Sequence, residues 1–531
     1  MIRDGSRGKA KSVPKGTLLR LALEPSLLVV SGALLVLAFP NFNLSFLAYI
    51  GFVPLFFAIE TKSPKKVFFI HSPRYKSGLS IPPKEPRALA RVGSISCATG
   101  FIFYLGALYW LYHVTVIGLI IACLYLAVYF GIFGIAISRL GILSAPIVWV
   151  ILEYIQANIP ILGFGWLSLG YSQYKNLPLI QIADFSGVYG VSFMVMMVNV
   201  SVYMSLRGAH SLHSVQAPRR SNLKKSVFGP LAMASLVLIA SCIYGFYRLN
   251  ERYDTTSARV SVIQGNIPQE LKWDPEAQDM IIEKYIALTK MAALESADLI
   301  VWPETSFPGF FEIDEDLTER VLTLAKEIKI PILIGANTTE QLPPRRWGLN
   351  PTYAVEEVGY FNSAVLISSK DEVINKYDKI HLVPFGEYVP FSNKFPALHK
   401  LVLGELGEFT PGKEFKTFSL QPSAFSQTVK FSVLICFEDI FPEISRKFVN
   451  SGAKFLIVIT NDAWYGKSGA AYQHTANSVF RAIENRVSVV RCANTGVSSF
   501  IDSRGRIYDS VSEKNSHLFI TGYKTAVVNI K

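Results

Sequence analysis

Acidic residues are scarce in the first half of this 531-residue chain. Residues 1–250 contain 6 Asp and Glu against 22 Lys and Arg, whereas the remainder contains 34 against 30. The net charge of +12 therefore belongs wholly to the first half. Only 17% of all residues are charged, whereas soluble domains carry about 25%. Part of the chain is thus expected to avoid water, and its basic charge needs an explanation other than nucleic-acid binding.

Cysteines and the common cofactor motifs are also few. The 5 cysteines are odd in number and widely spaced, so they form no disulfide framework. The sequence has no Gly-rich phosphate-binding loop and no metal-ligand spacing. We therefore expect neither a metal nor another cofactor. Disorder is excluded for most of the chain, because 50% of its residues are hydrophobic.

Long apolar runs dominate the first half. A membrane-spanning helix needs about 20 mainly apolar residues. Seven segments meet or approach this length: 18–39, 44–60, 97–112, 116–138, 143–158, 187–206 and 228–247. We therefore expect a polytopic α-helical membrane domain of about seven spans over residues 1–248. A linker at 249–257 then leads to a second domain at 258–531.

Basic residues alternate between the two sides of these segments. The N-terminal segment and the loops after the second, fourth and sixth segments hold 20 Lys and Arg, whereas the other loops hold only Lys175. Because positively charged loops stay in the cytoplasm, we expect the N-terminus there and the second domain on the far side. One loop on that side, 159–186, is long and aromatic. It is either an interfacial aromatic belt or a surface that meets both lipid and the second domain.

From residue 258 onward, predicted strands alternate with predicted helices. We expect strands near 259–264, 299–302, 331–335, 431–435, 455–460 and 488–491, and helices near 274–296, 317–328, 441–450 and 470–486. This alternation predicts an α/β domain with helix-covered sheets. Side chains that follow strands in such folds gather at one site. Glu304, Cys436 and the pair Asn461 and Asp462 each follow a predicted strand, so we expect them to converge.

A Pro- and Gly-punctuated loop, residues 376–390, carries Lys379 and Glu387 among large apolar side chains. The stretch 385–403 is also apolar, with few charges. Such a surface is unfavourable in water and suited to contact with acyl chains. Simple packing against the domain is the alternative.

Four motifs in the second half occur in a recognisable order. They are Trp-Pro-Glu-Thr (302–305), Lys-x-His-Leu-Val-Pro-Phe-Gly-Glu (379–387), Ile-Cys-Phe-Glu (435–438) and Asn-Asp-Ala-Trp-Tyr-Gly (461–466). In order and spacing they resemble the nitrilase, or carbon–nitrogen hydrolase, superfamily. Their union with a preceding membrane domain resembles the bacterial apolipoprotein N-acyltransferase family. Gly163-Phe-Gly-Trp and Lys272-Trp are also similar to that family.

The resemblance implies a nitrilase-like α-β-β-α sandwich and assigns roles in its site. It implies Cys436 as nucleophile, Glu304 as base, Lys379 as the group that lowers the thiol pKa and holds the oxyanion, and Glu387 as a supporting carboxylate. Other supporting positions are Glu438, Asn362, Trp464 and Phe437, the last of which replaces the tyrosine of many relatives. His381 offers a competing Cys–His pair, which we expect to be structural.

The activity implied by the resemblance is a ping-pong acyl transfer in lipoprotein biosynthesis. Cys436 would take an acyl chain from a phospholipid, expected to be phosphatidylethanolamine, as a thioester. The chain would then pass to the α-amine of the N-terminal diacylglyceryl cysteine of an apolipoprotein. This implies a bacterial inner-membrane enzyme with a periplasmic catalytic domain and no nucleic-acid partner. A membrane-tethered amidase acting on a small amide, and an inert scaffold or transporter, are the alternatives.

Overall fold

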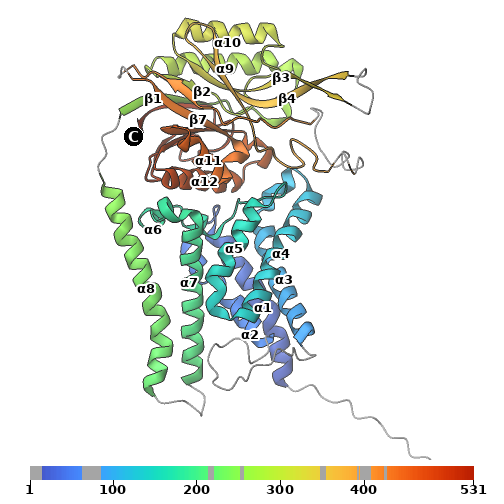
Figure 1. Cartoon of the computed structure of the whole chain (residues 1–531), viewed down its shortest axis with the longest axis vertical. Helices are drawn as coiled ribbons and strands as arrows, with labels where there is room; N and C mark the ends of the chain where they lie inside the picture. Colours follow the sequence, from blue (N-terminus) through green and yellow to red (C-terminus); the bar gives the residue numbers. More distant parts are fainter. Residues whose placement is uncertain are drawn as a thin grey trace, which may run out of the picture.

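The computed structural model describes residues 15–62, 85–212, 220–251, 256–346, 354–391, 394, 408–423 and 427–530. A bundle of apolar helices from the first half stands beneath an α/β sandwich from the second (Figure 1). Most of the predicted cytoplasmic loop at 61–93, and most of the apolar stretch beyond residue 391, lie outside the described residues.

All seven predicted apolar segments lie in helical regions. Four helices are long and apolar enough to cross a membrane: α3 (Glu85–Ala107), α4 (Val116–Leu140), α7 (Ala183–Leu212) and α8 (Arg220–Asn250). The other three segments form α1 (Lys15–Ala38), η1 (Ser45–Tyr49) with α2 (Val53–Lys62), and α5 (Ala145–Asn158). Their described apolar stretches are shorter. Short helices η2 (Tyr109–His113), η3 (Ile142–Ser144), η4 (Leu169–Gln173) and α6 (Leu177–Ile180) lie in the connections.

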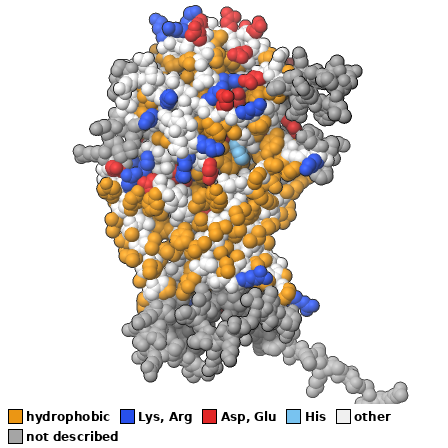
Figure 2. Space-filling model, in the orientation of Figure 1, with side chains coloured by type: hydrophobic (Ala, Val, Ile, Leu, Met, Phe, Trp, Pro, Cys, Tyr) orange, Lys and Arg blue, Asp and Glu red, His pale blue; other side chains and the backbone are white. Residues whose placement is uncertain are grey.

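Hydrophobic side chains face outward from this bundle. Ile117 and Ile121 of α4, and Leu236 and Ile243 of α8, are each more than half exposed. On the face that Figure 2 shows, hydrophobic side chains cover much of the helical half, whereas most of the coloured charged side chains lie on the sandwich. A continuous apolar surface of this size is unfavourable in water and favourable in lipid. The helices therefore form a membrane domain.

The second half contains two six-stranded sheets. The first has the order β12-β1-β2-β3-β4-β5 and the second the order β11-β10-β9-β8-β7-β6. The first sheet consists of β1 (Thr256–Gln264), β2 (Leu299–Val301), β3 (Ile332–Arg346), β4 (Ala354–Ile367), β5 (Val373–Asp378) and β12 (Gly522–Ile530). The second consists of β6 (Phe418–Leu420), β7 (Val429–Ile435), β8 (Phe455–Thr460), β9 (Ser488–Ala493), β10 (Ser499–Ile501) and β11 (Ile507–Ser510).

Helices cover the outer face of each sheet, which gives the α-β-β-α sandwich. α9 (Gln278–Ala293) and α10 (Glu315–Ile328) cover the first sheet. α11 (Pro442–Asn450) and α12 (Ala470–Asn485) cover the second and face the membrane helices (Figure 1). Neighbouring strands β1, β2 and β3 run parallel, as do β7, β8 and β9. Glu304, Cys436 and Asn461 follow the carboxyl ends of β2, β7 and β8, and a hydrogen bond from the Asn461 backbone N–H to Glu304 joins the ends of the two sheets.

Candidate active site

Glu304 lies just after β2, in a turn with unusual backbone geometry. The next residue, Thr305, has a φ of 45°, in the left-handed region that non-glycine residues rarely adopt. One carboxylate oxygen of Glu304 accepts hydrogen bonds from Asn362 Nδ2 at 2.8 Å and Lys379 Nζ at 3.2 Å. The other accepts from the backbone N–H of Asn461 at 2.9 Å. The carboxylate is thereby held in one orientation.

Lys379 follows β5 and links two carboxylates. Its ammonium lies 3.2 Å from Glu304 Oε1 and 2.9 Å from Glu387 Oε1, and only 1% of the side chain is exposed. Asn362 of β4 bridges the same two oxygens, since its Nδ2 also lies 2.9 Å from Glu387 Oε1. Glu387 is fixed in turn by the backbone N–H of Val383 at 2.7 Å. The structure therefore brings Glu304, Lys379, Glu387 and Asn362 together.

Cys436 lies at the first position after β7 and is 6% exposed. Its φ of 53° is also left-handed, so the nucleophile candidate lies in a strained strand-to-helix turn. The charges of the Glu304 carboxylate and the Lys379 ammonium both act on its thiol. Thiol, carboxylate and ammonium thus form one buried cluster.

The charges in this cluster favour a neutral thiol next to a carboxylate. Burial would raise the pKa of Glu304, but Lys379 chiefly, with Asn362 and Lys272, outweighs it and lowers that pKa below the usual 4.5. Burial raises the pKa of Cys436, the Glu304 charge raises it further, and Lys379 opposes both without cancelling them. Lys379 lowers the pKa of the thiol, as expected, but burial and Glu304 raise it more. Burial lowers the pKa of Lys379, but Glu387 and Glu304 raise it more, so that the ammonium persists.

Glu438 ties the cysteine turn to the lysine loop. One of its oxygens accepts from Tyr377 Oη at 2.7 Å and from the backbone N–H groups of Ile380 at 2.8 Å and His381 at 3.2 Å. The other accepts from the backbone N–H of Ile435 at 2.8 Å. Burial raises the pKa of this carboxyl, although these hydrogen bonds oppose the change. Glu438 therefore supports the site by joining the backbone before Cys436 to the backbone after Lys379.

Three aromatic positions differ in how they relate to the site. Phe437 is buried and packs 5.2 Å from Phe441, ring centre to ring centre. The ring of His381 packs 5.9 Å from Phe437 and 4.0 Å from Phe441, and burial, then Lys379, lowers its pKa to about 4. Trp464 is 42% exposed. The ring of the next residue, Tyr465, packs against Trp110 of the membrane domain.

Lys272 is a site residue to which sequence reasoning assigned no role. Its ammonium donates to the Glu304 carbonyl at 3.1 Å and to Thr305 Oγ1 at 2.8 Å. Burial lowers the pKa of Lys272 to about 7, despite the opposing charge of Glu304. In the sequence, only the Lys272-Trp dipeptide pointed to this residue. The local pattern does not show whether such a lysine is buried or solvated.

His474 is a second residue that the sequence did not point to. It lies inside α12 and is fully buried, with Nδ1 3.1 Å from Asp462 Oδ1. Arg491 Nη2 holds the other Asp462 oxygen at 3.1 Å. Burial would raise the pKa of Asp462, but Arg491 and His474 lower it to about 2. These groups brace the turn that begins at Asn461.

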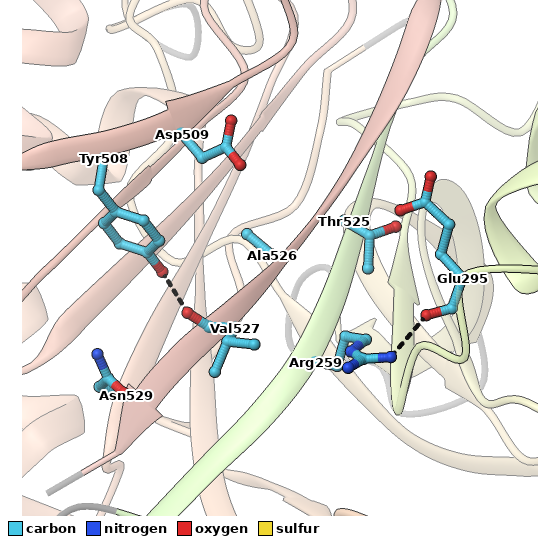
Figure 3. Close-up of a pocket in the computed structure, with 8 residues that line it drawn as sticks. All are labelled: Arg259, Glu295, Tyr508, Asp509, Thr525, Ala526, Val527 and Asn529. Carbon is cyan, nitrogen blue, oxygen red and sulfur yellow. Dashed lines mark hydrogen bonds between the residues drawn. The ribbon is translucent and has the colours of Figure 1, made fainter.

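A separate hollow of about 730 Å³ lies where β11 and β12 meet (Figure 3). Its polar groups bind one another: Tyr508 donates to the Val527 carbonyl at 2.8 Å, and Arg259 donates to the Glu295 carbonyl at 3.0 Å. It shares no residue with the cluster of thiol, carboxylates and ammonium. The candidate site is therefore that cluster.

The fold and this cluster define a carbon–nitrogen hydrolase-type domain joined to a membrane domain. A family profile described as carbon-nitrogen hydrolase matches residues 259–527, and one described as apolipoprotein N-acyltransferase N-terminal domain matches residues 31–72 and 82–201. The apolipoprotein N-acyltransferase of Geobacter metallireducens is 39% identical over 90% of this chain and 85% of its own length. That of Chlorobaculum tepidum is 31% identical over 93% and 90%. The chain belongs to the apolipoprotein N-acyltransferase family, as its motifs predicted.

Among solved structures, an amidase from Nesterenkonia sp. aligns with 51% of this chain and 89% of its own. The identity is 18% and the TM-score 0.33.

Proposed function

We propose that this acyltransferase N-acylates lipoproteins through a thioester on Cys436. The observation that carries the proposal is the buried cluster in which Glu304 lies 3.2 Å from Lys379 and the charges of both act on the buried Cys436 thiol. The thiol proton passes to Glu304 as sulfur attacks the ester carbonyl of a phospholipid. Lys379 stabilises the oxyanion. The C–O bond breaks, Glu304 returns the proton to the leaving oxygen, and a lysophospholipid departs.

The second half-reaction transfers the acyl chain to nitrogen. The α-amine of the N-terminal diacylglyceryl cysteine of a lipoprotein attacks the thioester and gives a proton to Glu304. The C–S bond breaks, an amide forms, and the proton returns to Cys436. Glu387 and Asn362 hold Lys379 and Glu304 in place, Glu438 and Phe437 shape the cysteine turn, and Trp464 is a further supporting residue. Phosphatidylethanolamine stays the predicted donor.

We further propose seven spans, with the N-terminus in the cytoplasm and the sandwich in the periplasm of a bacterial inner membrane. The four long apolar helices and the three shorter ones support this count. α7 begins at the sandwich, where Asp184 lies 2.6 Å from Arg486, and carries Arg207 near its other end. The proposed domain limits, 1–248 and 258–531 around a linker at 249–257, fit the end of α8 at Asn250 and the start of β1 at Thr256.

One experiment tests the proposed chemistry. The full chain in nanodiscs is incubated with phospholipid that carries a labelled acyl chain, and hydroxylamine-sensitive label on the protein is measured. We expect label on the wild type and on Cys492→Ala, a buried cysteine outside the site, and none on Cys436→Ala. A diacylglyceryl peptide with a free α-amine should then remove the label, and an N-acetylated peptide should not. Equal labelling of Cys436→Ala would contradict the proposal.

The same preparation separates the amidase alternative. A hydrolase would release ammonia from a small amide and pass little label to a peptide amine. An inert scaffold would show neither reaction.

A further inference from the structure

The backbone of the nucleophile is held by a histidine from another element. The Nε2 of His474 lies 3.1 Å from the Cys436 carbonyl oxygen, and since a carbonyl only accepts, Nε2 is the donor. Cys436 has a left-handed φ of 53°, so this hydrogen bond holds the backbone of the nucleophile candidate at a strained residue. The imidazole is anchored at Nδ1 by Asp462. His474 thus contacts the strained turn itself.

The membrane domain holds this histidine in place. The Trp166 ring, from the loop after α5, lies 4.9 Å from the His474 ring at an angle of 36°. Trp166 is only 1% exposed. The aromatic loop predicted at 159–186 therefore meets the catalytic domain, at the residue behind the nucleophile.

The neighbouring residue, Gln473, joins α12 to three separate segments of the membrane domain. Its Oε1 accepts from the indole N–H groups of Trp110 and Trp166, both at 3.0 Å. Its Nε2 donates to the carbonyls of Pro40 and Ala107, both at 2.9 Å. Two donors on one side and two acceptors on the other fix the orientation of the amide. All four hydrogen bonds of this buried amide are thus made with the membrane domain.

The same two indoles also pack against Tyr465, in the turn next to the base. The Trp110 ring lies 4.5 Å from the Tyr465 ring, in the short helix η9 (Asp462–Tyr465). The residue before this helix, Asn461, donates its backbone N–H to Glu304. Both the nucleophile and the base are therefore connected to the membrane domain through one intervening residue or turn.

We propose that His474 is a positioning residue for Cys436, and that Gln473 with Trp166 makes its position depend on the membrane domain. The inference rests on the proposed function, because it concerns the rate at which Cys436 is acylated. Docking of the sandwich on the membrane domain then does more than place the enzyme near lipid. It completes the geometry of the nucleophile.

The test compares two amide variants of His474, each of which places an N–H near the position of one of the two ring nitrogens. His474→Gln places an N–H near the position of Nε2, and His474→Asn near that of Nδ1. A displacement of about 1 Å in a reacting group can cost about 10²-fold in rate. In the single-turnover labelling assay with the full chain, we expect His474→Asn to be slower by about 10²-fold and His474→Gln to recover about 10-fold of that loss. The phospholipid concentration for half-maximal rate should stay unchanged.

A second pair of variants tests the dependence on the membrane domain. Gln473→Leu removes the four hydrogen bonds and should slow labelling by about 10-fold or more. Gln181→Leu is the matched control, because Gln181 is also buried and crosses the same interface, with hydrogen bonds to Arg486 at 2.7 Å and to the Arg504 carbonyl at 2.9 Å. It should label at the wild-type rate.

Equal rates for His474→Gln and His474→Asn would overturn the positioning role. A wild-type rate for Gln473→Leu, or an equal loss for Gln181→Leu, would overturn the dependence on the membrane domain. Should His474→Asn fail to fold, Gln473→Leu decides, since it leaves the His474 side chain itself unchanged. Absence of label on the wild type would instead contradict the proposed function.

Discussion

The surroundings of Glu304 and Cys436 favour different protonation states for the two side chains. The carboxylate is held ionised by Lys379, and the thiol is kept neutral by burial and by that same carboxylate. In the proposed reaction, sulfur becomes nucleophilic as its proton moves to Glu304, so we expect the rate to depend on a general base in the transition state.

The Glu304→Gln variant tests this assignment. Glutamine keeps the size of the side chain and one acceptor oxygen but takes up no proton. We expect thioester formation to fall by about 10²- to 10⁴-fold. Glu283→Gln, at an exposed glutamate paired with Arg320 at 2.6 Å, is the control and should react normally. A loss of only a few fold in Glu304→Gln would point to another base.

The pH dependence of the wild type provides an independent check on Glu304. A carboxylate whose pKa lies below 4.5 stays ionised as the pH falls from neutral, and it is protonated only below that value. The labelling rate should therefore hold between pH 7 and about pH 5. A fall centred between pH 6 and 7 would contradict this, since it would indicate a base with a pKa near neutral.

At the scale of elements, strand β3 makes room for the turn that carries the base. A Cβ at Gly335 would lie 2.3 Å from the Pro303 carbonyl oxygen and 2.7 Å from the Glu304 Cα. The Gly335 carbonyl also accepts from the backbone N–H groups of Ser306 at 2.8 Å and Phe307 at 3.1 Å. The strand and the turn are therefore in backbone contact, and any side chain would separate them.

Gly335→Ala should displace that turn. We expect the free energy of unfolding to fall by about 1–3 kcal/mol and thioester formation to slow by about 10-fold or more. Gly359→Ala in β4 is the control, because its Cβ would meet only side chains, Phe361 at 2.9 Å and Leu342 at 3.0 Å, which can move. Denaturant unfolding and the labelling rate measure both effects. A Gly335→Ala enzyme with the wild-type rate would show that the turn tolerates the shift.

Prediction of the elements succeeded where the pattern is local. β2, β7 and β8 are short apolar runs that end in polar residues, so their positions and their site residues could be predicted. β4 and β5 were not predicted, because they are defined by pairing within the sheet, as in the antiparallel match of Ile332 with Ile367. Local hydrophobicity carries no information about such partners.

At the scale of the whole molecule, ion pairs mark two ends of the membrane domain. Asp184 at the start of α7 contacts Arg486 of the sandwich and also Arg248 of α8 at 3.1 Å. Arg207, near the other end of α7, contacts Glu60 of α2 at 2.5 Å. At this second end α2 ends at Lys62 and α7 at Leu212, each shortly before a part of the sequence rich in Lys and Arg, which fits the proposed cytoplasmic face there and a periplasmic sandwich.

Reporter fusions test this orientation. Alkaline phosphatase, which is active only after export, should be active when fused after Glu251 and inactive when fused after Arg207. Green fluorescent protein, which fluoresces in the cytoplasm, should give the opposite result at the same two positions. Active phosphatase after Arg207 would contradict the proposed topology.

The amino-acid sequence by itself determined the apolar helices, the charge asymmetry, the sandwich and the members of the Glu304, Lys379 and Cys436 set. Each of these depends on local hydrophobic pattern or on short motifs. Only the tertiary structure decided how burial and charge act on the thiol and carboxylate, and where Lys272, Gln473 and His474 lie. Those features depend on burial and on contacts such as Trp166 with Gln473, 307 positions apart in the chain. Local sequence does not specify which distant groups will share a low-dielectric interior.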